Sequence, residues 1–78
     1  MVEASNVAVT LRQAINDECG YDLEIRRDMT ASSIEGWDSL AHVRIILNLE
    51  ARLGTEIDMD ATYRCETLGD LIDLVATA

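Results

Sequence analysis

The chain has 78 residues, of which 49% are hydrophobic and only 4% aromatic, so its sequence predicts one domain over residues 1–78 with an aliphatic core built by helices. Fifteen acidic residues against six bases, all of them arginine, give a net charge of -9. This charge argues against a nucleic-acid partner, because a phosphate backbone needs a cationic footprint, and the chain is also short for a stand-alone enzyme.

The first expected element is a helix over residues 5–19. Apolar residues recur there at helical spacing, Ser5 is a suitable N-cap, and Gly20 ends the pattern. No period holds from residue 21 to residue 36, where isolated aliphatic residues alternate with charged and small polar ones. We expect a long connecting loop there, pinned to the core at a few points, and loops of this length are often functional.

The strongest helical pattern covers residues 39–53, with Asp38 as the N-cap and Gly54 as the end. A single helical turn is expected over residues 61–64, and a last helix begins at Thr67, whose spacing to Asp70 predicts a capping box. The expected fold is therefore all-α: a small bundle of three main helices plus one short helix, with a long loop between the first and second helices.

The predicted helix over residues 39–53 carries two apolar stripes. The first contains Ile45, Ile46, Leu49 and Leu53 and suits a core. The second contains Leu40, Val43 and Leu47, and a polar ridge of Arg44, Asn48 and Arg52 lies beside it. Either the helix is central and covered on two sides, or the second stripe stays exposed to receive a partner protein or a tethered ligand.

Ser39 occupies the first turn of this helix, directly after Asp38. A helix N-terminus presents unpaired backbone N–H groups and the positive end of a dipole, so a phosphate attached there is stabilised. Serine at a helix start is also a common structural residue, and the position alone leaves both interpretations open.

The sequence Gly36-Trp37-Asp38-Ser39-Leu40 opens a helix in a short acidic chain, after a long loop, and Glu56-Ile57-Asp58 precedes the expected one-turn helix. In these features the whole chain resembles the acyl carrier protein family. The resemblance implies that Ser39 carries covalent 4′-phosphopantetheine derived from coenzyme A, and that Asp38 is the motif acid and helix cap.

The resemblance also implies a mechanism and a set of partners. A phosphopantetheinyl transferase would direct the Ser39 hydroxyl onto the β-phosphate of coenzyme A, releasing adenosine 3′,5′-bisphosphate. An acyl- or aminoacyl-loading ligase or acyltransferase would then form a thioester on the arm, and downstream pathway enzymes would use it. The carrier would position its cargo without catalysis, docking through Leu40, Val43, Arg44 and Leu47.

One departure concerns the pathway. Fatty-acid carriers typically line this helix with acids, whereas here Glu50 is the only acid after Asp38, and Arg44 and Arg52 lie on the helix. The motif looks more like that of free-standing carriers from polyketide, nonribosomal-peptide or other specialised pathways. The fatty-acid synthesis carrier remains an alternative within the same class.

Other function classes fit less well. The glycine of the motif lies three residues before Ser39 and no glycine follows it at the second position, so the motif differs from the hydrolase Gly-x-Ser-x-Gly elbow. His42, the one histidine, is expected to be partly buried and hydrogen-bonded rather than a catalytic base. The non-enzymatic alternative is an unmodified helical adapter that binds proteins through the second stripe.

Location and oligomeric state complete the expectations. No apolar run reaches the roughly 18 residues that cross a bilayer, so we expect a cytoplasmic monomer without membrane contact. Cys19 and Cys65 lack Cys-x-x-Cys spacing and a neighbouring histidine, so no metal site is indicated. Buried free thiols are favoured over a disulfide.

Overall fold

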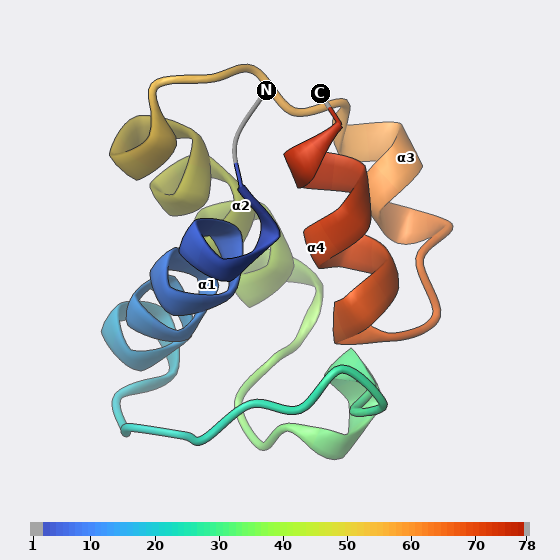
Figure 1. Ribbon diagram of the computed structural model, residues 1–78. Coiled ribbons are helices and arrows are strands. Elements are labelled where there is room, and N and C mark those ends of the chain that lie inside the picture. The colour runs from blue at the N-terminus through green and yellow to red at the C-terminus, as the bar shows by residue number, and fades with distance from the viewer. Residues whose placement is uncertain (1–2, 78) are drawn as a thin grey trace.

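The computed structural model describes residues 3–77, and these form four α-helices and one 3₁₀ turn with no strand. The elements, in chain order, are α1 (Ala4–Cys19), η1 (Ala31–Ser33), α2 (Ser39–Leu53), α3 (Met59–Tyr63) and α4 (Leu68–Ala76) (Figure 1). The prediction of an all-α bundle with three longer helices, one short helix and a long first loop is confirmed.

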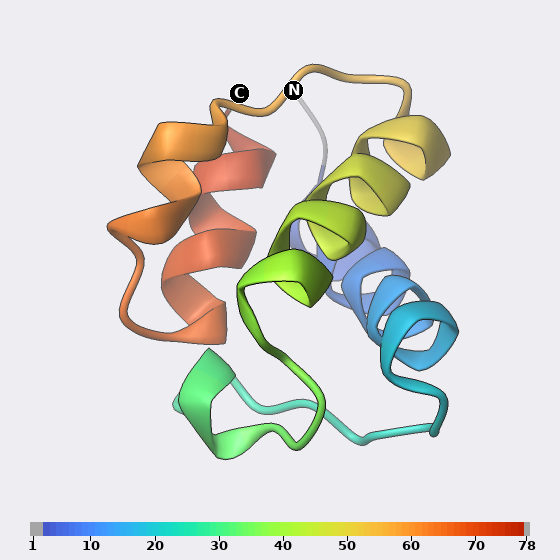
Figure 2. The ribbon, with the colours of Figure 1, turned by 180° about the vertical axis from the view of Figure 1, so that it is seen from behind.

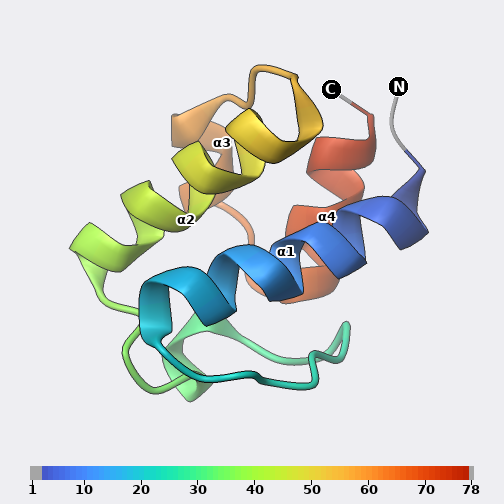
Figure 3. The ribbon, with the colours of Figure 1, turned by 90° about the vertical axis from the view of Figure 1, so that its left-hand side faces the viewer.

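Helix α1 packs against both α2 and α4 and so joins the bundle together (Figures 1 and 3). The contact surfaces are the aliphatic stripes of the three helices, spaced three or four residues apart so that they share one face. Removing each such side chain from water contributes roughly 1.5–3 kcal/mol to folding. The side chains buried completely are Val7, Leu11, Ala14, Ile15, Ile45, Ile46, Leu49 and Val75.

The helix ends follow the expected capping chemistry with two exceptions. Asp38 caps α2, Gly54 ends it in a left-handed conformation, and α4 begins with the capping box of Thr67 and Asp70. The prediction of Ser5 as the first N-cap is wrong: the amide of Val7 bonds to the carbonyl of Glu3, so the helix starts earlier and Ser5 lies inside it.

The short helix is the second exception, because it begins two residues before the predicted turn. The Asp58 carboxylate accepts hydrogen bonds from the amides of Asp60 and Ala61, which places the N-cap at Asp58. Helix α3 therefore covers Met59–Tyr63, and Arg64 is its C-cap.

The first loop crosses one end of the bundle and reaches the start of α4 (Figures 1 and 3). The carbonyl of Met29 accepts a bond from the amide of Leu68 at 2.8 Å, and the carbonyl of Arg27 accepts one from the amide of Gly69 at 2.9 Å. A Cβ at Gly69 would lie 3.0 Å from the Arg27 carbonyl oxygen, which is tighter than an ordinary contact, so this approach favours glycine. The loop is thus fixed by backbone hydrogen bonds as well as by the apolar contacts we expected.

Both cysteines are free thiols, but they are half-buried and not fully buried as predicted. Cys19 ends α1 and Cys65 follows α3, so each lies at the edge of the core. Burial is nevertheless the largest cause that raises the pKa of both thiols above the ordinary value. No helix of the described residues is long and apolar enough to span a membrane, and they contain no group of three metal-ligating side chains.

Candidate functional site

Ser39 is the first residue of α2, and its side chain is exposed. Asp38 lies directly before it and accepts two hydrogen bonds. Its Oδ1 accepts one from the amide of Ala41 at 2.8 Å, and its backbone carbonyl accepts one from the amide of His42 at 2.9 Å. Within residues 3–77 the amides of Ser39 and Leu40 have no hydrogen-bond partner. The helix start therefore presents a hydroxyl and two free N–H groups, which together suit a phosphate ester.

The turn before Ser39 depends on Gly36, which has a φ of 90°, a conformation that side chains rarely allow. Gly36 also lies close to the end of α1, because a Cβ built on it would be 3.5 Å from the Cβ of Cys19, an ordinary packing distance. The hydroxyl of Tyr21 donates to the carbonyl of Glu35 at 2.9 Å and holds the same turn from the other side of the loop. The backbone that presents Ser39 is therefore supported from α1 and from the first loop.

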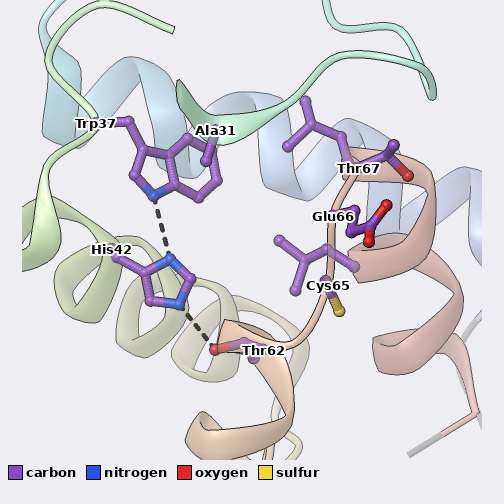
Figure 4. Close-up of a pocket in the computed structure, with 9 residues that line it drawn as sticks. Ala31, Trp37, His42, Thr62, Cys65, Glu66 and Thr67 are labelled. Carbon is purple, nitrogen blue, oxygen red and sulfur yellow. Dashed lines mark hydrogen bonds between the residues drawn. The ribbon is translucent and has the colours of Figure 1, made fainter. Parts of the chain in front are cut away.

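A chain of polar side chains lies beneath the helix start and links α2 to α3 (Figure 4). The indole N–H of Trp37 donates to Nδ1 of His42 at 3.1 Å, and Nε2 of His42 lies 2.8 Å from Oγ1 of Thr62. The hydroxyl of Thr62 lies 2.6 Å from the carbonyl of Met59. Tyr63 stacks on the imidazole, with 4.3 Å between the ring centroids.

These contacts fix the proton positions on His42. Because Trp37 can only donate, Nδ1 must accept, so the proton of the neutral imidazole is on Nε2 and is donated to Thr62. The hydroxyl hydrogen of Thr62 is then free for the carbonyl of Met59. Burial lowers the pKa of His42 and keeps it in this neutral form. The prediction of a hydrogen-bonded histidine is confirmed, and the side chain is buried where the prediction was partial burial.

A small cavity of about 30 Å³ borders this chain. Its walls come from the first loop, α2, α3, α4 and the linker between the last two helices (Figure 4). This volume is far below the roughly 150 Å³ of an apolar cavity that can hold benzene. The residues that line it are Ala31, Trp37, His42, Thr62, Cys65, Glu66, Thr67, Leu68 and Leu71.

The outer surface of α2 carries the second apolar stripe. Leu40 and Leu47 are 59% and 53% exposed, and Val43 between them is half-buried. When the bundle is seen from behind, α2 and α3 lie in front of α1 and α4 (Figure 2). The possibility that α2 is covered on two sides is therefore wrong for the described chain. Tyr63, the last residue of α3, is 54% exposed.

The predicted polar ridge beside the stripe is only partly a free surface. Arg52 forms an ion pair with Asp17 of α1, and Asn48 donates hydrogen bonds to Asp17 and Glu18. The bond from Arg52, with a further one from Asn48, lowers the pKa of Asp17. Arg44 is exposed and forms no ion pair within residues 3–77, whereas the charge of Arg52 is already paired with Asp17.

Glu50 is likewise engaged within the molecule. Its Oε2 accepts a hydrogen bond from the amide of Ile57 at 2.6 Å, across the loop that follows α2. No other residue of α2 is acidic. The outward face of α2 therefore offers apolar groups and one arginine to a partner.

The structure brings Asp38, Ser39 and Leu40 to one helix start, and Val43, Arg44 and Leu47 continue along α2. The contributions of Thr62 and Tyr63 were not predicted from the sequence. Their contacts with His42 join residues about 20 positions apart. A buried histidine needs partners for both nitrogens, and that requirement was the one available signal.

Comparison with known proteins agrees with this geometry. Residues 9–75 match the family described as a phosphopantetheine attachment site. Two curated proteins are similar, both called acyl carrier protein, from Tropheryma whipplei strains Twist and TW08/27. Each is 29% identical over 73 residues, which covers 92% of this chain and 89% of the relative. No solved structure matches the chain significantly.

Proposed function

The chain belongs to the acyl carrier protein family, and from this premise we propose that it holds acyl or aminoacyl intermediates as thioesters on an arm attached to Ser39 and presents them to partner enzymes. The prosthetic group of the family is 4′-phosphopantetheine. The observation that carries the assignment to Ser39 is its position: an exposed hydroxyl at the start of α2, inside the matched region.

The residues at this position fit the prosthetic group. The amides of Ser39 and Leu40 are free to bond to phosphate oxygens, and the α2 dipole favours a negative charge there. When bound, the group supplies a flexible chain that ends in a thiol. Asp38 keeps the helix start ordered through its two bonds to α2 amides, so the serine is presented in a defined position.

The chemistry of transfer belongs to the partners. Among the described residues no base is hydrogen-bonded to Ser39, and both nitrogens of His42 are engaged in the interior. We propose that the phosphopantetheinyl transferase supplies the base, and that a loading ligase or acyltransferase and downstream enzymes act on the arm. They would dock on Leu40, Val43, Arg44 and Leu47, where apolar area is exposed beside one positive charge.

The same surface supports a proposal about the pathway. The outward face of α2 carries Arg44 and no free acid, so enzymes that recognise an acidic helix would find no complement here. We therefore favour a polyketide, nonribosomal-peptide or other specialised pathway over fatty-acid synthesis. Such enzymes would present acidic or neutral groups opposite Arg44.

The central experiment is an intact-mass measurement after incubation with a broad-specificity phosphopantetheinyl transferase and coenzyme A. The wild type should gain the mass of one phosphopantetheine, and Ser39→Ala should gain none. Ser5→Ala is the matched control, because Ser5 is also an exposed serine in the first turn of a helix. An unmodified wild type would instead support the adapter function, with Leu40 and Leu47 binding a protein directly.

A further inference from the structure

Trp37 and His42 lie on either side of Ser39 in the sequence, and a hydrogen bond joins their side chains. We propose that both are positioning residues for the transfer of the arm. Their hydrogen-bonded side chains form a clasp that holds the Ser39 hydroxyl where the transferase needs it. The proposal rests on the proposed function, because it concerns the reaction that loads Ser39.

The clasp closes over the start of α2 (Figure 4). Trp37 precedes the N-cap Asp38, and His42 is the fourth residue of the helix. Side chains at these two positions often pack together as an apolar staple, which fixes the direction from which the chain enters a helix. Here the contact is polar and directional, because the indole N–H donates to Nδ1 of the imidazole at 3.1 Å. The ring centroids lie 5.9 Å apart.

The clasp is anchored to a second helix. Nε2 of His42 lies 2.8 Å from Oγ1 of Thr62 in α3, and Tyr63 stacks on one face of the imidazole. The ring cannot turn without losing a contact at each nitrogen and on this face. His42 therefore gives Trp37 a fixed partner.

Ser39 itself has little that holds it in place. Its side chain is exposed, and its amide has no hydrogen-bond partner within residues 3–77. The first turn of a helix frays readily, because its amides lack partners inside the helix. Asp38 closes the turn through its bond to the amide of Ala41, and the clasp encloses that turn from residue 37 to residue 42. The place of the Ser39 hydroxyl depends on both.

The transfer itself needs a well-placed serine. The Ser39 oxygen bonds to the β-phosphorus of coenzyme A, the bond from this phosphorus to adenosine 3′,5′-bisphosphate breaks, and the hydroxyl proton passes to the base of the transferase. A displacement of about 1 Å can lower the rate of such a step about 100-fold. Loss of the clasp should therefore lower kcat. It should change KM little, because the proposed docking side chains on the outer face of α2 are still present.

Two substitutions of His42 separate the two ends of the imidazole. Asparagine places its amide oxygen near the position of Nδ1 and can still accept from Trp37. Glutamine places its amide nitrogen near the position of Nε2 and keeps only the bond to Thr62. His42→Asn should therefore keep the clasp, and His42→Gln should lose it. Trp37→Phe also loses it, because phenylalanine keeps an aromatic ring but has no donor.

NMR tests the clasp without any enzyme. Trp37 is the only tryptophan of the chain, so its indole proton gives one identifiable resonance. This resonance should keep its wild-type position in His42→Asn and move upfield in His42→Gln, where the hydrogen bond is lost. The same position in both variants would overturn the proposal.

Transfer is then measured with a broad-specificity phosphopantetheinyl transferase and coenzyme A, on protein that circular dichroism shows to be folded at the assay temperature. Intact mass of the wild type comes first, because an unmodified wild type refutes the proposed function before the clasp is considered. For Trp37→Phe and His42→Gln we expect kcat to fall about 10-fold, with KM within about twofold of the wild type. For His42→Asn we expect kcat within about threefold of the wild type.

Val7→Ala is the control for a loss of stability alone. Val7 is fully buried in the first turn of α1, and the starts of α1 and α2 lie at opposite ends of the bundle (Figure 3). This truncation lowers the melting temperature through a cavity and should leave kcat unchanged. A kcat that falls in Val7→Ala as it does in Trp37→Phe would overturn the proposal, because the clasp would then act only through stability.

The kinetic comparison can also refute the proposal directly. Equal kcat values for Trp37→Phe and the wild type would do so, as would equal losses for His42→Asn and His42→Gln. If a variant of His42 does not fold, the comparison of Trp37→Phe with Val7→Ala still decides.

Discussion

The indole of Trp37 donates its only hydrogen bond to Nδ1 of His42, and this single 3.1 Å contact determines which nitrogen of the imidazole carries the proton. Protonation of Nδ1 would remove the acceptor and place two N–H groups against each other. The folded protein therefore disfavours the imidazolium form beyond the effect of burial alone. Titration of His42 should be visible in the stability of the whole bundle.

We expect stability to fall on mild acidification for this reason. Burial lowers the pKa of His42 below its ordinary value of 6.5, so the unfolded chain takes up a proton that the folded chain does not. The stabilisation that comes from neutral His42 is fully present above pH 6.5. It is lost as the pH falls from 6.5 to the pKa of His42 in the folded protein. Urea unfolding at about pH 7.5 and about pH 5.5 should show the loss. The variant His42→Gln should lose less unfolding free energy than the wild type between these two pH values. Equal losses in the two proteins would contradict the assignment of the pH dependence to His42.

The start of α2 should depend on Asp38 as a cap. Asp38→Ala removes the acceptor for the Ala41 amide and should lower the free energy of unfolding by about 1 kcal/mol. Asp38→Asn keeps an acceptor oxygen, so its free energy of unfolding should fall much less. Ser39→Ala should stay close to the wild type, because Ser39 is exposed. Denaturant unfolding of the three variants measures this order, and a loss for Ser39→Ala as large as that for Asp38→Ala would contradict it.

The close approach of the first loop to α4 makes Gly69 sensitive. In a helix interior, alanine is normally more favourable than glycine by about 1 kcal/mol. Here its Cβ would meet the Arg27 carbonyl oxygen at 3.0 Å, so Gly69→Ala should instead lower the melting temperature by several degrees. Asp73→Ala, which removes only the exposed ion pair with Arg27, should have a smaller effect. A Gly69→Ala variant more stable than the wild type would show that the loop shifts without loss.

Substitutions of the two arginines of α2 should have different effects, one on stability and the other on docking. Arg52→Glu places a carboxylate beside Asp17 and should lower the melting temperature. Arg44→Glu should leave stability unchanged and reduce loading by the cognate enzymes, with a larger effect at low salt. It should also improve recognition by fatty-acid synthesis enzymes. Transfer rates at about 20 mM and about 200 mM salt test this, and equal rates for Arg44→Glu and wild type would remove Arg44 from the docking surface.

Added salt should stabilise the protein. Only four of its fifteen carboxylates pair with arginine within residues 3–77, so a net charge of -9 leaves uncompensated repulsion. The melting temperature should rise by a few degrees between about 10 mM and about 200 mM salt, and divalent cations should act at lower concentration. A melting temperature that does not respond to ionic strength would show that the acids are too far apart to interact.

The sequence was sufficient where local chemistry decides the structure. Helical spacing together with Asp38 and Gly54 predicted both ends of α2, and Thr67 with Asp70 predicted the start of α4. Ser5 shows the limit of such reasoning, because a serine inside the first turn and a serine at the N-cap are alike in sequence.

Long-range contacts could not be predicted in this way. Asn48 and Arg52 continue the helical ridge of Arg44, and only the packing of α1 against α2 reveals that they face Asp17. The contact of Arg27 with Gly69 joins residues 42 positions apart. In both pairs, the sequence around one residue does not predict its contact with the other. Tertiary packing alone determines these pairs.

The attachment of the first loop to α4 has a consequence for protein synthesis. The segment that leads to Ser39 is anchored through Met29 and Arg27 to Leu68 and Gly69, which the ribosome adds about 30 residues after the serine itself. During translation Ser39 emerges well before the residues that hold its preceding loop in place. If the transferase recognises the ordered helix start, modification must wait until α4 has left the ribosome and its first turn has bonded to the first loop, so Ser39 becomes a substrate only after these later residues have been made.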